Sequence, residues 1–189
     1  MAKPLDTLTP KARRTRQTLI DAARVVIGQD GLAGLNVMRV CQMAGVGRTS
    51  FYDYFDSADG LTEAVAAESV QTFKARFDAA HLDLPRGLLR LRSCLRFVLQ
   101  LTVDDPETAL LLTSLATGNG SVRSVIRAEI AEELNGAKLC SPALEQYLST
   151  TLLAQTRELA RGRSKAAHLN EIVQMMMAAC GQEETIQVR

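Results

Sequence analysis

The chain has 189 residues, a length that suits one domain or two small ones. Apolar residues make up 47% of it, enough for a hydrophobic core, and the net charge of +1 at pH 7 does not by itself indicate a nucleic-acid-binding protein. No signal peptide is visible, and the apolar runs are too short or too interrupted to span a bilayer. We therefore expect a cytoplasmic protein without a membrane partner.

The charged residues are unevenly distributed along the chain. Residues 1–50 contain eight lysines and arginines and three acidic residues, a net charge of +5. Residues 51–80 contain two basic and six acidic residues, a net charge of −4. A local basic excess is what neutralisation of DNA phosphates requires, so residues 1–50 are the candidate nucleic-acid-binding region.

The first predicted helix begins at Thr9-Pro10, where threonine is a good cap and proline fits the first turn. It runs to about Ile27 and ends at the glycine-containing segment 28–31. Several basic residues lie in this helix and in the irregular tail before it. They form either an arm that follows a DNA groove or an ordinary solvated tail and helix face; these residues are Lys3, Arg13, Arg14 and Arg16.

Two short helices joined by a tight turn are predicted within residues 36–55. Asn36 can cap the first, about Val37–Met43, because its side chain can accept a bond from a free backbone N–H group. Gly45 permits a sharp turn, and the second helix runs from about Arg48 to Tyr54. This order is the helix-turn-helix plan, in which the second helix enters the DNA major groove.

The same segment resembles the DNA-binding region of the TetR family of transcriptional regulators. The resemblance rests on Ala-Gly-Val at 44–46, Phe-Tyr at 51–52, Tyr-Phe at 54–55 and Ser-Ala-Asp-Gly-Leu at 57–61, all at the family's spacing. The sequence departs from the family where Gly47 replaces a serine-like cap, Thr49 replaces a common glycine or proline, and Ala58 replaces a frequent phosphate-contacting lysine.

Candidate DNA contacts divide into residues that read bases and residues that hold phosphates. Arg48 lies at the start of the recognition helix, where an arginine can donate two hydrogen bonds to guanine. The predicted base readers are Arg48, Thr49, Ser50 and Asp53. The predicted phosphate contacts are Arg39, Tyr52, Tyr54 and Ser57; for the two tyrosines the resemblance implies this role, and a half-buried core position is the alternative.

The remainder of the chain predicts helices and no strand, which gives an all-α protein of about nine helices. The later helices are expected at about residues 58–80, 86–103, 106–117, 121–135, 142–161 and 164–180. We divide the chain into a three-helix DNA-binding domain (1–57), a connecting helix (58–84) and a helical domain (85–189). The resemblance implies that this last domain binds a ligand and dimerises.

Two apolar stripes near the end of the chain predict the surface of a homodimer. One lies on the helix at 142–161 and the other on the helix at 164–180. Such stripes form either the core of one chain or a four-helix interface between two copies, and the resemblance favours the interface. The predicted interface residues are Leu144, Leu148, Leu152, Leu169, Ile172, Val173, Met176 and Met177.

The helix at 86–103 carries both arginines and leucines and predicts one wall of a ligand pocket. In one interpretation Arg92 and Arg96 lay their apolar stems on the core and keep their charges in water. In the other, one of them turns inward and meets an anionic group on an otherwise apolar effector molecule. The predicted pocket residues are Arg92, Arg96, Leu112, Leu115, Tyr147, Thr151 and Gln155.

Residues with catalytic or metal-binding spacing are not evident. The two histidines have no nearby nucleophile and acid, no glycine-rich phosphate loop follows a strand, and four scattered cysteines suggest buried apolar residues in a reducing compartment, with a thiol sensor as the alternative. No enzyme activity, cofactor or metal is expected. The predicted function is a repressor released from a double-stranded, palindromic DNA operator by a small molecule. The alternative is a helix-turn-helix protein whose C-terminal half docks a protein partner.

Overall fold

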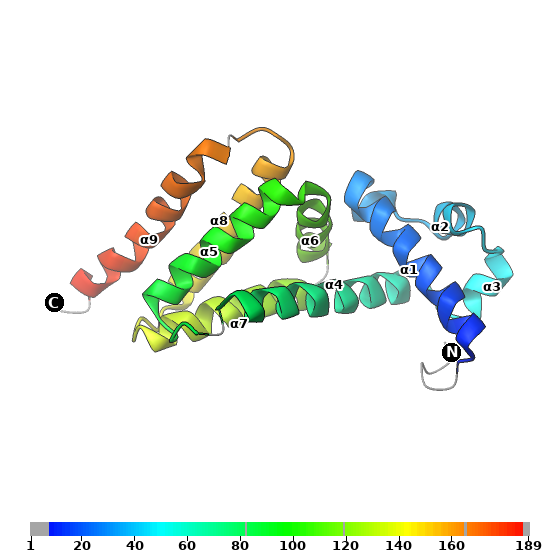
Figure 1. The fold of residues 1–189 in the computed structure, drawn as a ribbon, viewed down its shortest axis with the longest axis horizontal. Coiled ribbons are helices and arrows are strands. Elements are labelled where there is room, and N and C mark those ends of the chain that lie inside the picture. Colours follow the sequence, from blue (N-terminus) through cyan, green and yellow to red (C-terminus); the bar gives the residue numbers. More distant parts are fainter. Residues whose placement is uncertain (1–7, 82, 119, 165, 187–189) are drawn as a thin grey trace.

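The computed structural model describes residues 8–81, 83–118, 120–164 and 166–186. These residues form nine α-helices and short 3₁₀ helices without any strand, so the predicted all-α fold class is confirmed (Figure 1). Within the described residues no helix is both long and apolar enough to cross a membrane. Lys3 of the predicted basic arm lies outside the described residues.

The N-terminal part consists of α1 (Pro10–Asp30), the 3₁₀ helix η2 (Leu32–Gly34), α2 (Val37–Ala44) and α3 (Arg48–Tyr52). The predicted caps form: the Thr9 hydroxyl accepts a hydrogen bond from the Ala12 N–H group, and the Asn36 side chain accepts one from the Arg39 N–H group at 2.8 Å. Each cap satisfies a donor that the first turn of a helix leaves free, which fixes where the helix begins.

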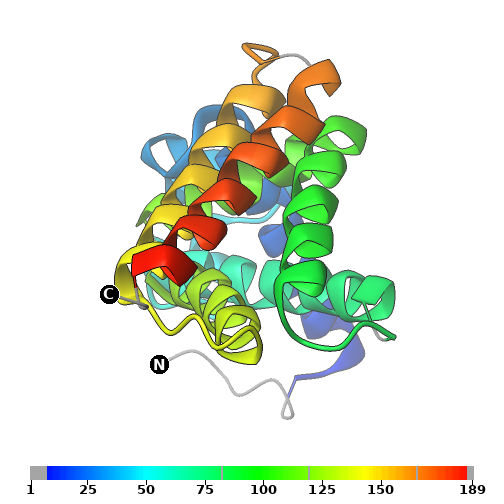
Figure 2. The ribbon, with the colours of Figure 1, turned by 90° about the vertical axis from the view of Figure 1, so that its left-hand side faces the viewer.

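Helix α4 leads away from these helices toward the C-terminal part of the molecule (Figure 1). The remaining helices are α4 (Ala58–His81), α5 (Leu88–Asp104), α6 (Pro106–Gly118), α7 (Gly120–Gly136), α8 (Pro142–Ala160) and α9 (Leu169–Ile186). Helices α5, α8 and α9 pack together at the end of the molecule farthest from α3, as both views show (Figures 1 and 2).

Several predicted helix boundaries are wrong. Helix α1 continues past Ile27 to Asp30 and α9 continues past residue 180 to Ile186, and two further boundaries differ for a local reason. The recognition helix α3 ends at Tyr52 rather than Tyr54, because the N–H groups of the next two residues bond to carbonyls of Ser50 and Phe51 in a tight turn. Helix α9 begins at Leu169, after the 3₁₀ helix η3 (Ala166–His168), and not at Ser164. The N–H of Ser164 instead bonds back to the Glu158 carbonyl and helps to close the end of α8.

The apolar side chains form two cores, and α6 connects the first core to the C-terminal helices. The first core holds the N-terminal helices α1, α2 and α3 together with part of α4, and it also contains Leu111 and Leu115 of α6. The second core joins α5, α7, α8 and α9. The helix-turn-helix domain is therefore packed directly against the C-terminal part of the chain as well as joined to it through α4.

The predicted dimer stripes belong largely to the second core, which corrects the predicted interface. Met177 is half-buried, and the other seven residues are buried within a single chain. Buried side chains already packed against α5 and α7 are not available to a second copy. The buried residues are Leu144, Leu148, Leu152, Leu169, Ile172, Val173 and Met176. Amphipathic spacing identified the faces correctly as apolar, but the same chain covers them.

Candidate DNA-binding surface and ligand cavity

The turn between α2 and α3 sets the direction of the recognition helix. Gly45 has φ 64° and ψ 27°, a left-handed conformation that glycine adopts without steric cost, and its N–H bonds to the last carbonyls of α2. Gly47 then precedes α3 without any side-chain cap. This matches the sequence departure at that position, where a serine-like cap is absent.

Helix α3 has one buried face and one exposed face. Phe51 is fully buried in the first core, and Phe55 just beyond the helix packs beside it with a ring separation of 5.7 Å. The predicted base readers Arg48, Thr49 and Ser50 are all exposed. The aromatic anchor therefore holds α3 so that its first turn faces outward, which is the geometry that major-groove reading needs.

Asp53 and Tyr54 lie in the turn after α3 rather than on the helix. Asp53 is exposed, whereas Tyr54 is partly buried against the first core. Tyr52 is 45% exposed and makes an edge-to-face contact with Phe51. Of the two tyrosines, Tyr52 thus has the more accessible phenol group.

The other predicted phosphate contacts already make local interactions. The Arg39 guanidinium forms an ion pair with Asp30 at 2.5 Å, so a phosphate has to share or replace that partner. The Ser57 hydroxyl accepts a hydrogen bond from the Gly60 N–H group at the start of α4. It keeps its own proton to donate, which suits a phosphate at this helix N-terminus.

Basic residues of α1 divide into exposed and paired groups. Lys11, Arg13 and Arg14 are exposed. Arg16 is instead held over the Phe55 ring, 5.0 Å from its centroid, and lies 3.7 Å from the Glu68 carboxylate. Arg16 therefore fixes α1 against α4, and the predicted basic surface is carried by its three exposed neighbours.

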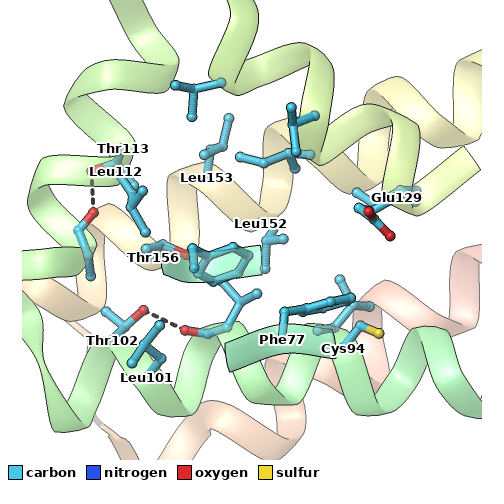
Figure 3. Close-up of a pocket in the computed structure, with 18 of the residues that line it drawn as sticks. Phe77, Cys94, Leu101, Thr102, Leu112, Thr113, Glu129, Leu152, Leu153 and Thr156 are labelled. Carbon is cyan, nitrogen blue, oxygen red and sulfur yellow. Dashed lines mark hydrogen bonds between the residues drawn. The ribbon is translucent and has the colours of Figure 1, made fainter. Parts of the chain in front are cut away.

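An apolar cavity of about 90 Å³ lies between α4, α5, α6, α7 and α8 (Figure 3). Aromatic rings of Phe73 and Phe77 come from the second half of α4, and leucines come from α5, α6 and α8. Its wall includes three threonines and Glu129, but the surface that faces the cavity is almost entirely apolar. A concave apolar site with a few polar groups is typical of small-molecule binding.

Of the seven residues predicted to line the pocket, one lies in the cavity wall and six lie elsewhere. Leu112 lines the cavity. Leu115 is buried in the first core, and Tyr147, Thr151 and Gln155 lie outside the cavity wall. Arg92 and Arg96 are exposed on α5, so the inward orientation is wrong and their charges remain in water.

Several cavity residues were not among the predicted pocket set. They include Phe73 and Phe77 on the connecting helix, Glu129 on α7 and Thr156 on α8. The aromatic pair at i, i+4 on that helix is a usable sequence signal. A single glutamate or threonine on an amphipathic helix carries no comparable signal, because its burial depends on which helices pack against it.

Glu129 forms an ion pair across the edge of the cavity. Its Oε1 lies 2.5 Å from the Lys74 ammonium, which joins α7 to α4. The hydrogen bond with Glu129 raises the pKa of Lys74 above its usual range, so Lys74 stays charged at neutral pH. The only charged side chain in the described cavity wall is thus already neutralised from outside.

The buried carboxylate of Glu133 fastens the loop between α4 and α5 to the end of α7. Its Oε1 lies 3.0 Å from Arg86 and 3.1 Å from Arg90, and its Oε2 accepts a hydrogen bond from the Gly87 N–H group. Arg86 also pairs with Glu132 on the surface. The loop that ends α4 is therefore held by charge as well as by packing.

The four cysteines differ in exposure. Cys41, Cys94 and Cys180 are buried as expected, whereas Cys140 is exposed, with its Sγ 2.9 Å from the Asn135 Oδ1 atom. Burial and the nearby Glu133 carboxylate raise the pKa of Cys94, which lines the cavity, to about 12.

Iodoacetamide at pH 8 should therefore modify Cys140 and leave Cys94 intact, because the thiolate is the reactive form. Mass spectrometry of the native protein, with the unfolded chain as control, measures both. An unfolded cysteine ionises near pH 8.5, whereas folded Cys94 has a pKa of about 12. The protonated Cys94 thiol therefore contributes fully to the free energy of unfolding below about pH 8.5, and this contribution declines as the pH rises. Rapid modification of native Cys94 would contradict the burial.

Comparison with known proteins supports the helix-turn-helix assignment. Residues 19–65 match the family model described as bacterial regulatory proteins, tetR family. This match confirms the resemblance inferred from the sequence and identifies a DNA-binding domain in this region. No curated protein matches the chain.

Solved structures share the fold of the whole chain at low sequence identity. A TetR-like transcriptional regulator from Rhodococcus sp. RHA1 is 17% identical, with a TM-score of 0.68 over 86% of this chain and 93% of that one. FadR from Bacillus subtilis, in complex with stearoyl-CoA, is 16% identical, with a TM-score of 0.64 over 85% and 97%. NalD of Pseudomonas aeruginosa, the secondary repressor of the MexAB-OprM multidrug efflux pump, is 13% identical, with a TM-score of 0.65 over 89% and 96%.

Proposed function

We propose that this chain, which carries the DNA-binding domain and the fold of TetR-family regulators, is a dimeric repressor that leaves its operator when a small apolar molecule fills the cavity. The observation that carries the proposal is the cavity between α4 and α8, on helices that also contact the DNA-binding domain. The alternative, a C-terminal half that only docks a protein partner, has no need of an internal cavity.

Helices α4 and α6 support a mechanical connection between cavity and DNA-binding domain. The first half of α4 packs in the first core through Leu61 and Val65, and its second half supplies Phe73 and Phe77 to the cavity. Helix α6 has the cavity residue Leu112 beside residues that pack in the first core. A ligand that moves either helix therefore moves α1 to α3 with it.

The size of the cavity supports a change of conformation on binding. Its volume of about 90 Å³ is smaller than the roughly 150 Å³ of an engineered cavity that accommodates benzene. A larger ligand has to push the surrounding helices apart. Such a ligand stabilises the widened state, and operator affinity falls by the same coupling factor by which DNA weakens ligand binding.

The test of the regulator function is direct selection of bound DNA. The purified protein, incubated with random duplexes, should enrich a near-palindromic sequence whose half-sites match two recognition helices. Affinity for the selected duplex should fall steeply as salt rises, because bound phosphates release counterions. Failure to enrich any sequence would contradict the proposal.

For dimerisation we propose the outward faces of α8 and α9, in place of the buried stripes. These faces expose large apolar side chains at Tyr147, 45% exposed, and Met175, 62% exposed. Both helices lie at the end of the molecule opposite α3, facing the viewer in Figure 2. Two copies joined there leave both recognition helices free to contact DNA, which supports this choice.

Met175→Glu should convert the dimer to monomers, because a charge buried in an apolar contact loses its hydration. Light scattering measures the mass, and operator binding should be lost with the dimer. Val25→Glu is the matched control: Val25 is an exposed apolar residue of α1, a helix at the opposite end of the molecule from α9 (Figure 1), and this variant should stay dimeric. A Met175→Glu protein that remains dimeric would place the interface elsewhere.

A further inference from the structure

One residue of the cavity wall has a hydroxyl group for which the structure shows no hydrogen-bond partner within the described chain. Thr156 on α8 is 5% exposed, and its Oγ1 atom makes no hydrogen bond within the described chain. Buried hydroxyls almost always have a partner, because losing the hydrogen bonds of water without replacement costs free energy. A ligand that hydrogen-bonds to such an unsatisfied group therefore gains more binding free energy than it gains from the surrounding apolar surface.

The other two threonines of the cavity show what Thr156 lacks. The Thr102 hydroxyl donates to the Val98 carbonyl at 2.9 Å, and the Thr113 hydroxyl donates to the Ala109 carbonyl at 3.0 Å. This bond to the preceding helical turn is the usual way in which a buried threonine satisfies its proton. Thr156 makes no such bond, and its Oγ1 atom is almost fully covered by the side chains around it. Its proton and its lone pairs therefore become available to a ligand that pushes the surrounding helices apart as it enters the cavity.

The charges around the cavity disfavour an ionic ligand. Its described lining includes no lysine, arginine or histidine, so a carboxylate would be buried without a cation. Glu129 is the only charged lining residue, and Lys74 already binds it. A cationic ligand would have to displace that lysine. Figure 3 also shows Glu129 at the opposite side of the cavity from the threonines.

We propose that the ligand of this cavity is a neutral, largely apolar molecule with one hydroxyl, carbonyl or amide group that hydrogen-bonds to Thr156. The inference rests on the proposed function, because it names the ligand class of the same regulator. The rings of Phe73 and Phe77 give the apolar body an aromatic surface to pack on.

The test uses the full chain and four small probes that differ only in the group attached to one benzene ring: toluene, benzyl alcohol, benzylamine and benzoate. Binding is measured by thermal shift and by calorimetry. Benzyl alcohol should bind about three- to tenfold more tightly than toluene, the effect of one added hydrogen bond. Benzoate and benzylamine should bind more weakly than either.

Thr156→Val keeps the shape of the side chain and removes the hydroxyl. This variant should bind benzyl alcohol and toluene with affinities within twofold of each other, while the melting temperature of the free protein is unchanged or raised because an unsatisfied group has gone. Ser69→Ala is the matched control. It removes another buried, unpaired hydroxyl, on α4 and outside the cavity wall, and should retain the preference for the alcohol.

Three results would overturn the proposal: no probe raises the melting temperature, the alcohol preference survives in Thr156→Val, or an ionic probe binds best. A neighbouring surface pocket is lined by Arg123 and Arg157. If benzoate binds and Arg157→Met abolishes this binding, the ligand is an anion that reaches that pocket. Operator binding is measured separately. If the alcohol preference holds but no operator is bound, the regulator function fails and the ligand class stands.

Discussion

Replacing Arg48 with alanine will remove discrimination at one or two base pairs in each half-site of the operator. Arg48 is exposed at the first turn of α3, where an arginine donates two hydrogen bonds to a guanine edge. Each lost contact costs about 1–3 kcal/mol, so a dimer with two half-sites should lose about 2–6 kcal/mol, at least thirtyfold in affinity. Competition binding against single-base variants of the selected operator measures the change.

Tyr52→Phe is the control for this experiment, because its phenol group is a predicted phosphate contact next to the same helix turn. Its loss should weaken all sequences about equally, by roughly 0.5–1.5 kcal/mol per half-site, and leave base preference intact. An Arg48→Ala protein with an unchanged sequence preference would remove Arg48 from the base readers and direct attention to Thr49 and Ser50.

Glu133→Gln should destabilise the protein by about 3 kcal/mol, a large part of the stability of an ordinary domain. The Glu133 side chain is 2% exposed and faces two guanidinium groups, of which Arg90 is nearly buried. Glutamine keeps the shape and the hydrogen bond from Gly87 but removes the charge, which leaves Arg90 without its counter-ion. The midpoint and slope of urea unfolding give the free energy.

Glu132→Gln is the matched control, one residue earlier on the same helix and paired with the same Arg86. Its side chain is 52% exposed, so solvent screens the pair and its loss should cost less than about 1 kcal/mol. Equal losses in the two variants would mean that burial of Glu133 does not strengthen its ion pairs, and that packing alone holds the α4–α5 loop on α7.

The helices and the DNA-binding motif were determined largely by local sequence. Asn36 caps α2 and Gly45 ends it because these interactions involve neighbours within a few residues, which the sequence displays directly. The spacing of Phe51 and Phe55, four residues apart, is typical of one helix face, and both side chains are buried while Arg48 is exposed. These features need no knowledge of what lies across the molecule.

Only the tertiary structure decided which apolar helix faces are buried against other helices of the same chain and which polar residues lie in the cavity wall. Leu148 and Met176 have the periodicity of an interface, but periodicity does not distinguish a second copy from helix α5. Arg92, Glu133 and Thr156 occupy similar amphipathic helices, yet the first is exposed and the others are buried. Their environments depend on contacts between helices far apart in the chain, since burial of a polar group is set by its neighbours in space.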